Sequence, residues 1–324
     1  MLLDYEKICE ITFGAVSVTE ENGFYNFYRF SEEQFLNIIK KGGTYYQRSI
    51  GTASIRFSFV TKSEHISFTY KLTAGSSRKF AGFDLYENGV MKGHAYITDD
   101  MPQTDRINFT LSKGEKHVEL YFPFSKCASL SAVEIDDGCE IKAVKRSRKM
   151  IAFGDSITQG YDATHPSLSY VNQLSAMLDA DCINKGIGGE CFCPELPRVK
   201  DNINPEIVTV AYGTNDWSKK TFEEFDKNCT DFFKALYSSY SNSKIVVITP
   251  LWRYDANGSR KINIPHSAMH SEITKRCDFI PGIQIINGYE LFPNMTSFFL
   301  DEKLHPNDLG FSIYVNNLYR QIHI

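Results

Sequence analysis

The sequence predicts two structural parts in one chain, an antiparallel β-sandwich followed by a three-layer α/β domain with a parallel sheet. Three observations predict this arrangement. The chain has 324 residues, too many for one small domain. Residues 44–144 carry short alternating runs between frequent turns, and from residue 150 onward apolar strands alternate with amphipathic helices. We place a jelly-roll-like sandwich over residues 1–148 and the α/β domain over residues 149–324.

The first part shows the period of strands that bury one face. Polar and apolar side chains alternate in four short runs: 54–60, 65–70, 117–122 and 131–135. Turn sequences occur nearby, at 74–77, 87–89 and 112–115. Frequent turns with this alternation are typical of an antiparallel sandwich. Ahead of the runs, Ser31 and Gln34 form a capping box that predicts a short N-terminal helix.

The second part shows a different pattern. Continuous apolar runs at 150–153, 207–211 and 245–248 are typical of strands buried on both faces of a parallel sheet. Helical spacing of apolar residues follows in three segments: 170–178, 222–236 and 309–322. Active sites in such sheets lie at the carboxyl ends of the strands. We therefore expect the functional residues directly after the apolar runs.

Composition excludes several classes of function. The chain has 35 Lys and Arg against 39 Asp and Glu, a formal charge of -4, so we expect no nucleic-acid partner. The basic run at 145–149 is interpreted as a solvated linker. No apolar stretch is long enough to span a membrane, and the acidic N-terminus does not resemble a signal peptide. We expect a cytoplasmic protein, with no membrane partner, whose 8 cysteines are free thiols.

Four polar blocks follow strands or lie near the C-terminus: 154–160, 184–190, 212–217 and 301–307. In this order they resemble the SGNH hydrolases, also called the GDSL esterase/lipase family. The name refers to a Ser in a Gly-Asp-Ser motif, a Gly, an Asn and a His near the C-terminus. The resemblance covers residues 150–324 and implies that family's α/β fold and a serine esterase activity.

A second resemblance lies in the sandwich. The sequence Gly82-Phe83-Asp84-Leu85-Tyr86 is similar to the Gly-x-Asp-Leu-Tyr signature of a β-sandwich that precedes SGNH domains in some bacterial carbohydrate esterases. Read without the resemblance, the same residues are a turn followed by an ordinary strand. The sandwich could shape the substrate cleft, bind a glycan or build a homo-oligomer, and these three roles remain open.

The SGNH resemblance implies a role for four residues. Ser156 is the expected nucleophile and His305 the base that takes its proton. The expected oxyanion donors are the backbone N–H groups of Ser156 and Gly189 and the side-chain amide of Asn215. Taken alone, Ser156 reads as a helix cap, Gly189 as a turn glycine and His305 as a surface histidine. The four blocks together favour the catalytic interpretation.

The acid that orients His305 departs from the family pattern. SGNH enzymes usually place an Asp three residues before the His, and here that position holds Glu302, whereas Asp301 lies four residues before. We favour Asp301, because a loop can absorb one residue, and keep Glu302 as a candidate. A backbone carbonyl could also orient the imidazole.

Two further residues are candidates for lining the substrate pocket, Asp155 and Trp217. Asp155 is also expected to fix loop geometry, and Trp217 is equally compatible with a buried wedge between loops. Cys191 and Cys193 lack the spacing of a zinc site, so we expect no metal and no cofactor.

The predicted function is that of a carboxylic ester hydrolase for small acyl esters, acetyl esters foremost, on a small molecule or oligosaccharide. Related proteins with a sandwich before an SGNH domain include carbohydrate deacetylases, and the substrate class rests on that analogy. An acyltransferase on the same scaffold and a non-catalytic glycan-binding protein are the alternatives.

Overall fold

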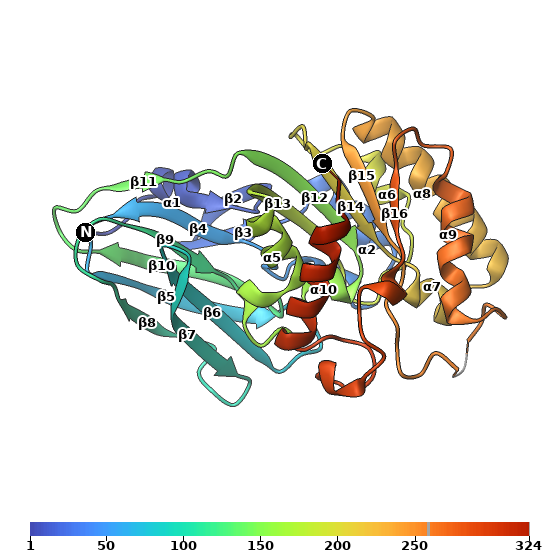
Figure 1. Ribbon diagram of the computed structural model, residues 1–324. Helices are drawn as coiled ribbons and strands as arrows, with labels where there is room; N and C mark the ends of the chain where they lie inside the picture. The colour runs from blue at the N-terminus through green and yellow to red at the C-terminus, as the bar shows by residue number, and fades with distance from the viewer. Residues whose placement is uncertain (258–259, 324) are drawn as a thin grey trace.

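Figure 1 shows a computed structural model in which a β-sandwich and an α/β part lie side by side. The structure describes residues 1–257 and 260–323. The first strand of the parallel sheet begins at Arg148, and we refer to residues 1–147 as the sandwich part and to the rest as the α/β part. The predicted fold class is confirmed: two antiparallel sheets are followed by one parallel sheet with helices.

Two antiparallel sheets pack face to face in the sandwich part. The first has the order β1 (Thr12–Phe13), β4 (Arg56–Thr61), β9 (Lys116–Tyr121), β6 (Phe80–Glu87) and β7 (Val90–Thr98), with β11 (Ile141–Ala143) beside β4. The second has the order β2 (Ser17–Glu21), β3 (Phe24–Tyr28), β10 (Lys126–Ile135), β5 (His65–Ala74) and β8 (Thr104–Thr110). Inward aromatic side chains fill the space between them. The rings of Phe57 and Phe122, for example, meet edge to face at 4.9 Å.

Three helices accompany the sandwich strands, where the sequence predicts one: α1 (Tyr5–Ile11), α2 (Glu32–Lys40) and α3 (Tyr45–Ser49). The predicted capping box is present, because Ser31 and Gln34 bond each other's backbone N–H groups. Ile38 of α2 is buried in a core that it shares with the parallel sheet. Helix α2 therefore packs on the α/β part although it precedes most of the sandwich in sequence.

The parallel sheet has the order β13 (Ala180–Gly186), β12 (Arg148–Gly154), β14 (Ile207–Ala211), β15 (Lys244–Ile248) and β16 (Gln284–Ile286). Side chains of β12 alternate between the two covering layers. Ile151 and Phe153 lie in the core with α6 (Glu195–Arg198), α8 (Phe222–Tyr240) and α9 (Met269–Cys277). Met150 and Ala152 lie in the core with α5 (Tyr170–Met177) and α10 (Asp308–Gln321). Burial on both faces explains the continuous apolar runs.

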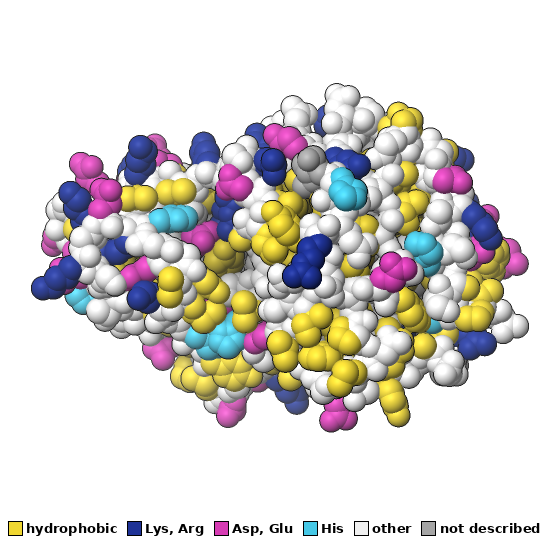
Figure 2. All heavy atoms as spheres, viewed as in Figure 1, with side chains coloured by type: hydrophobic (Ala, Val, Ile, Leu, Met, Phe, Trp, Pro, Cys, Tyr) yellow, Lys and Arg dark blue, Asp and Glu magenta, His cyan; other side chains and the backbone are white. Residues whose placement is uncertain are grey.

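The remaining elements are short and lie in the connections. They are the helices α4 (Ser156–Gln159) and α7 (Thr214–Lys219) and the 3-10 turns Pro166–Leu168, His266–Ala268, Gly288–Glu290 and Thr296–Phe298. Residues 1–257 and 260–323 contain no helix with the length and apolarity that crossing a membrane requires. On the face in Figure 2, charges of both signs are interspersed, and hydrophobic side chains gather across the lower middle.

Arg29 joins the two parts at one point. Its guanidinium is buried, and burial lowers its pKa to about 9. It donates to backbone carbonyls on both sides, the partners being Gly51, Arg48, Ser49, Asn184 and Gly186. Asn184 and Gly186 lie at the carboxyl end of β13, so a side chain of the sandwich part holds the end of a strand of the parallel sheet.

The aspartate of the Gly-x-Asp-Leu-Tyr sequence makes a second junction. Asp84 is fully buried, and its Oδ2 accepts hydrogen bonds from Ser167 N–H at 2.9 Å and Ser167 Oγ at 2.6 Å. Its Oδ1 binds His94 Nδ1 at 2.6 Å. Tyr86 of the same sequence contacts Ser167 Oγ at 3.0 Å. These residues therefore attach the sandwich part to the turn that precedes α5.

Candidate active site

The three polar loops begin at one level of the parallel sheet. Gly154, the last residue of β12, pairs with Gly186 of β13 on one side and with Ala211 of β14 on the other. The chain moves from β12 to β13 and then returns across β12 to β14, so the connections leave the strand ends in opposite directions. A crevice at such a point is where α/β sheets bind ligands.

Gly154 permits the tight turn that carries Ser156. A Cβ at this position would lie 2.0 Å from Thr158 Oγ1 and 2.8 Å from the carbonyl oxygen of Ala211, so only glycine fits. Asp155 then caps α4 by accepting the N–H of Ile157 at 2.9 Å. Ser156 is the first residue of α4 and is almost fully buried.

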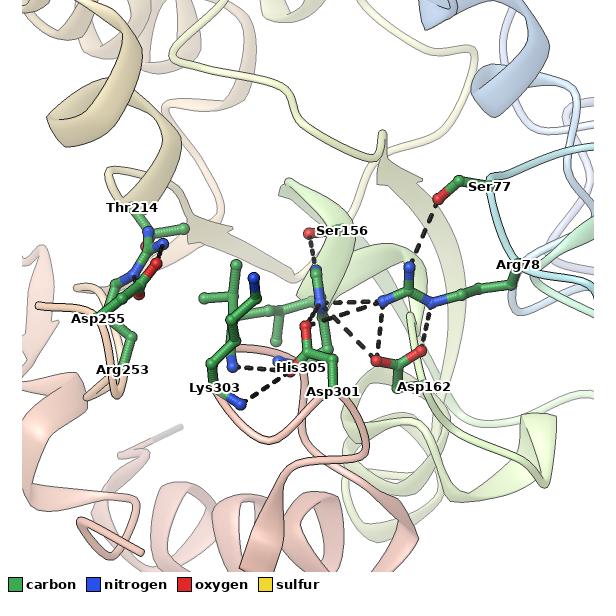
Figure 3. Close-up of polar contacts among 12 residues, drawn as sticks. Ser77, Arg78, Ser156, Asp162, Thr214, Arg253, Asp255, Asp301, Lys303 and His305 are labelled. Atoms are coloured by element: carbon green, nitrogen blue, oxygen red, sulfur yellow. Dashed lines mark hydrogen bonds and ion pairs between the residues drawn. The ribbon is translucent and has the colours of Figure 1, made fainter. Parts of the chain in front are cut away.

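A chain of hydrogen bonds links Ser156, His305 and Asp301 (Figure 3). Ser156 Oγ lies 2.8 Å from His305 Nε2, and His305 Nδ1 lies 2.6 Å from Asp301 Oδ2. With the Nδ1 proton directed to the carboxylate, Nε2 accepts from the serine hydroxyl. This is the contact geometry that the nucleophile, base and orienting acid adopt in serine hydrolases.

The structure distinguishes the two candidate acids. Asp301 Oδ1 accepts the backbone N–H groups of Lys303, Leu304 and His305 at 3.1, 2.8 and 3.0 Å. Burial would raise the pKa of Asp301, but the hydrogen bonds and charge of His305 outweigh it and hold that pKa well below its usual range. Glu302 is exposed and adopts a left-handed φ of 60°. Of these two acids, Asp301 is the one that reaches the imidazole.

Gly189 and Asn215 lie on the two loops beside Ser156. Gly189 has a φ of 78°, a conformation that favours glycine. Asn215 Nδ2 donates to Asp155 Oδ2 at 3.3 Å, which leaves the second amide hydrogen available. The predicted oxyanion donors thus come from the loops after β12, β13 and β14.

The two candidate pocket-lining residues are both buried. Trp217 is 1% exposed, and its indole N–H donates to the carbonyl of Ile264 at 2.9 Å, the contacts of a wedge between loops. Asp155 is buried as well, and both its carboxylate oxygens serve the loops. Burial raises the pKa of Asp155 to about 6, against the lowering effect of the Ile157 N–H.

Arg78 and Asp162 adjoin the imidazole, and no motif in the sequence points to either residue. Arg78 binds Asp162 through Nε and Nη2, and its Nη2 lies 3.1 Å from His305 Nδ1 (Figure 3). Asp162 is buried and has a φ of 73°. Arg78 follows the turn at Ser76-Ser77, and nothing local in either segment distinguishes it from a solvated turn. Through Arg78 the sandwich part contributes a side chain to this site.

Two groups of described side chains converge closely enough to share a cation: Asp84, His94 and His165, and Asp162, Asp301 and His305. In both groups the carboxylates already bind an imidazole or the Arg78 guanidinium. Cys191 and Cys193 are buried, and burial raises the pKa of the Cys193 thiol to about 12. Such thiols are unreactive and poor metal ligands, because the thiolate is the binding form.

A parallel α/β sheet with Ser, His and Asp in contact at its strand ends is the architecture of an acyl-transferring serine hydrolase. Residues 152–313 match the model of the GDSL-like Lipase/Acylhydrolase family. The chain belongs to this family. No curated protein sequence matches it.

Solved structures share the fold over both parts. The chain is similar to the salicylyl-acyltransferase SsfX3 of a tetracycline biosynthetic pathway, with a TM-score of 0.78, 18% identity, and 96% and 93% of the two chains covered. A Bacteroides ovatus protein described as a GDSL-like lipase gives a TM-score of 0.74, 19% identity and coverage of 96% and 94%. A family two carbohydrate esterase from Clostridium thermocellum gives a TM-score of 0.63 and 14% identity, with 84% of this chain and 92% of that chain covered.

Proposed function

We propose that the protein is a serine esterase that removes small acyl groups, acetyl foremost, from a hydroxyl of a carbohydrate. The hydrogen-bonded chain Ser156–His305–Asp301 carries this proposal. A serine hydroxyl attacks an ester only when a base takes its proton, and here the base is in place and is oriented by a carboxylate.

The reaction follows from these contacts. Ser156 Oγ forms a bond to the carbonyl carbon while its proton passes to His305 Nε2. The N–H groups of Ser156 and Gly189 and the amide of Asn215 bind the negative oxygen. His305 returns the proton to the departing alcohol, and water, deprotonated by the same imidazole, releases the acid and restores Ser156. Asp301 stays ionised throughout and stabilises the imidazolium.

The carbohydrate substrate is supported by the family two carbohydrate esterases among the similar structures, which also combine a sandwich with this α/β fold. A second candidate is acyl transfer to a hydroxyl other than water. The similarity to a salicylyl-acyltransferase, over 96% of this chain, supports it. Both reactions share the acyl-enzyme, and the acceptor that reaches it decides between them.

Hydrolysis of p-nitrophenyl acetate, butyrate and octanoate by the wild type and Ser156→Ala tests the proposal. We expect turnover that prefers acetate and disappears in the variant. Added glycerol or a methyl glycoside then competes with water, and an acylated product in excess of free acid would identify a transferase. Equal release of nitrophenol by both proteins would contradict the role of Ser156. A protein that binds acetylated oligosaccharides without turnover would be a glycan-binding protein.

A further inference from the structure

Two cationic side chains meet beside the proposed oxyanion glycine. Arg48 Nη1 and Lys219 Nζ lie 2.7 and 3.1 Å from the point that a Cβ on Gly189 would occupy. Arg48 belongs to α3 of the sandwich part, whereas Lys219 ends α7 of the α/β part. That Cβ would be bonded to the Cα of Gly189, so both charges lie within a few ångströms of the Gly189 N–H group.

Backbone carbonyls hold both cations in place. Arg48 Nη1 donates to the carbonyl of Gly188 at 2.6 Å, and Lys219 Nζ donates to the carbonyl of Gly189 at 2.7 Å. An arginine has five N–H donors and a lysine three, so each keeps donors for another partner. The carbonyls orient the two groups without neutralising their charges.

Neither cation has a carboxylate partner within salt-bridge distance in residues 1–257 and 260–323. Neighbouring lysines differ in this respect. Lys41 pairs with Glu190 at 2.8 Å and Lys220 with Glu224 at 3.8 Å. The carboxylate of Glu190, the residue after Gly189, is therefore already paired with Lys41. Two like charges held close together repel each other, and an anion between them relieves that repulsion.

We propose that Arg48 and Lys219 bind a carboxylate of the substrate, so that the preferred ester carries an anionic group close to the scissile carbonyl. This inference rests on the proposed function and specifies its substrate class. A guanidinium and an ammonium suit a carboxylate, which accepts charge-assisted hydrogen bonds from both. The carboxylate has two chemical sources, the acyl group of a dicarboxylic half-ester or the alcohol part, as in a uronic acid.

Matched ester pairs test the two sources. The acyl arm compares the p-nitrophenyl monoester of glutaric acid with neutral p-nitrophenyl valerate. The alcohol arm compares an O-acetylated methyl glucuronoside with the corresponding methyl glucoside. In one arm we expect kcat/KM to favour the anionic ester by about tenfold or more, through KM, and this preference to fall as NaCl rises.

Variants assign the preference to the two cations. Lys219→Met and Arg48→Met are each expected to lower the ratio of anionic to neutral kcat/KM about fivefold or more, and Lys219→Arg to retain most of it. Lys220→Met is the matched control, since Lys220 is the next residue but contacts Glu224, and its ratio should equal that of the wild type. Thermal denaturation of every variant checks that it is folded.

Two results would overturn the inference. One is the absence of any anionic preference in both arms, and the other is an equal loss on anionic and neutral esters in the Arg48 and Lys219 variants. If the wild type cleaves no ester, the proposed function fails, and calorimetric binding of glutarate and glucuronate decides the inference separately. Binding of one of them that Lys219→Met abolishes would sustain it, and no binding of either would reject it.

Discussion

Arg78 of the sandwich part and Asp162 of the α/β part form two parallel hydrogen bonds, from Nε to Oδ1 and from Nη2 to Oδ2, the second 2.8 Å long. Asp162 Oδ2 is also 3.8 Å from His305 Nδ1. The Nδ1 proton is directed to Asp301, so Arg78 packs beside the imidazole while it binds Asp162. The pair therefore lies at the same ring nitrogen that Asp301 binds, and Arg78 Nη2 is also 4.0 Å from Asp301 Oδ2, so it helps to hold both the imidazole and its acid in place.

Arg78→Met should lower kcat by up to about 100-fold with little change in KM, because a small displacement of His305 weakens proton transfer more than substrate binding. It should also lower the free energy of unfolding by about 2 kcal/mol, since Asp162 is left buried without its cation. The cost is below that of a fully buried pair because Arg78 is 24% exposed. Steady-state kinetics and urea denaturation measure both effects.

The double variant Arg78→Met/Asp162→Asn is the control for that prediction. It removes the unpaired charge, so its loss of stability should be smaller than the sum of the two single losses. Additive losses would show that the two residues act independently and would contradict the proposed positioning.

Asp301→Asn should reduce kcat by about 10³–10⁴-fold, because an amide favours the wrong imidazole tautomer and does not stabilise the imidazolium. Glu302→Gln is its matched partner one residue later, exposed and without contact to His305. We expect Glu302→Gln to remain within about twofold of the wild type, as is usual for surface substitutions. A larger loss in Glu302→Gln than in Asp301→Asn, measured with the same ester, would reverse the assignment.

Gly189→Ala tests the loop that carries the proposed oxyanion N–H. The left-handed φ of 78° costs alanine about 1 kcal/mol, and the added methyl displaces Arg48 and Lys219. Alanine keeps the backbone N–H, so kcat falls as far as the strained loop moves this donor, with the roughly 10²–10³-fold effect of losing a donor as the upper limit. Gly114→Ala is the control, because Gly114 has a φ of 83° with open space around it. It should lose the same roughly 1 kcal/mol for its left-handed φ and keep unchanged kinetics, and a similar kinetic loss in both variants would refute the argument.

Stability should also depend on pH through Asp216. Burial, aided by the charge of Glu190, raises the pKa of this carboxyl from 3.8 to about 7 against the opposing hydrogen bond from Phe192 N–H. Between these values the folded state holds a proton that the unfolded state has lost. The free energy of unfolding therefore falls as pH rises from about 4 to about 7.

Asp216→Asn should remove that dependence. Urea denaturation at pH 8 should find the variant more stable than the wild type by at least about 1 kcal/mol, with a smaller difference at pH 5. Asp105→Asn, on the exposed side of β8, serves as the control and should follow the wild type at both values. A wild type that gains stability between pH 5 and pH 8 relative to Asp216→Asn would contradict the expected sign.

Much of the fold could be predicted because burial leaves a pattern in the sequence. The apolar run at 207–211 coincides with β14, since a strand covered on both faces admits few polar residues. The loops of the site could be located because parallel strands end at a common edge. The choice of Asp301 over Glu302 was favoured from the family pattern, but the contact itself depends on the loop's left-handed turn at Glu302.

The rest depended on contacts between residues distant in sequence. Arg78 and Asp162 are 84 positions apart, and each lies in an ordinary polar turn whose neighbours give no sign of a partner. Trp217 illustrates an alternative that the sequence leaves open. A large aromatic residue after a site loop suits a pocket wall as well as a buried wedge, and its contact with the carbonyl of Ile264 depends on a residue 47 positions away.

Arg29 limits how this chain can be divided or recombined. Its guanidinium donates to the carbonyls of Asn184 and Gly186, immediately before the loop that carries Gly189. A separately expressed copy of residues 148–324 would lack the donor at that strand end, and one of the two cations beside Gly189 would be missing as well. A sandwich taken from a relative would restore these contacts only if it placed an arginine at the positions of both Arg29 and Arg48. The two parts must therefore be inherited together, and an exchange between related proteins would succeed only when it transfers the whole junction.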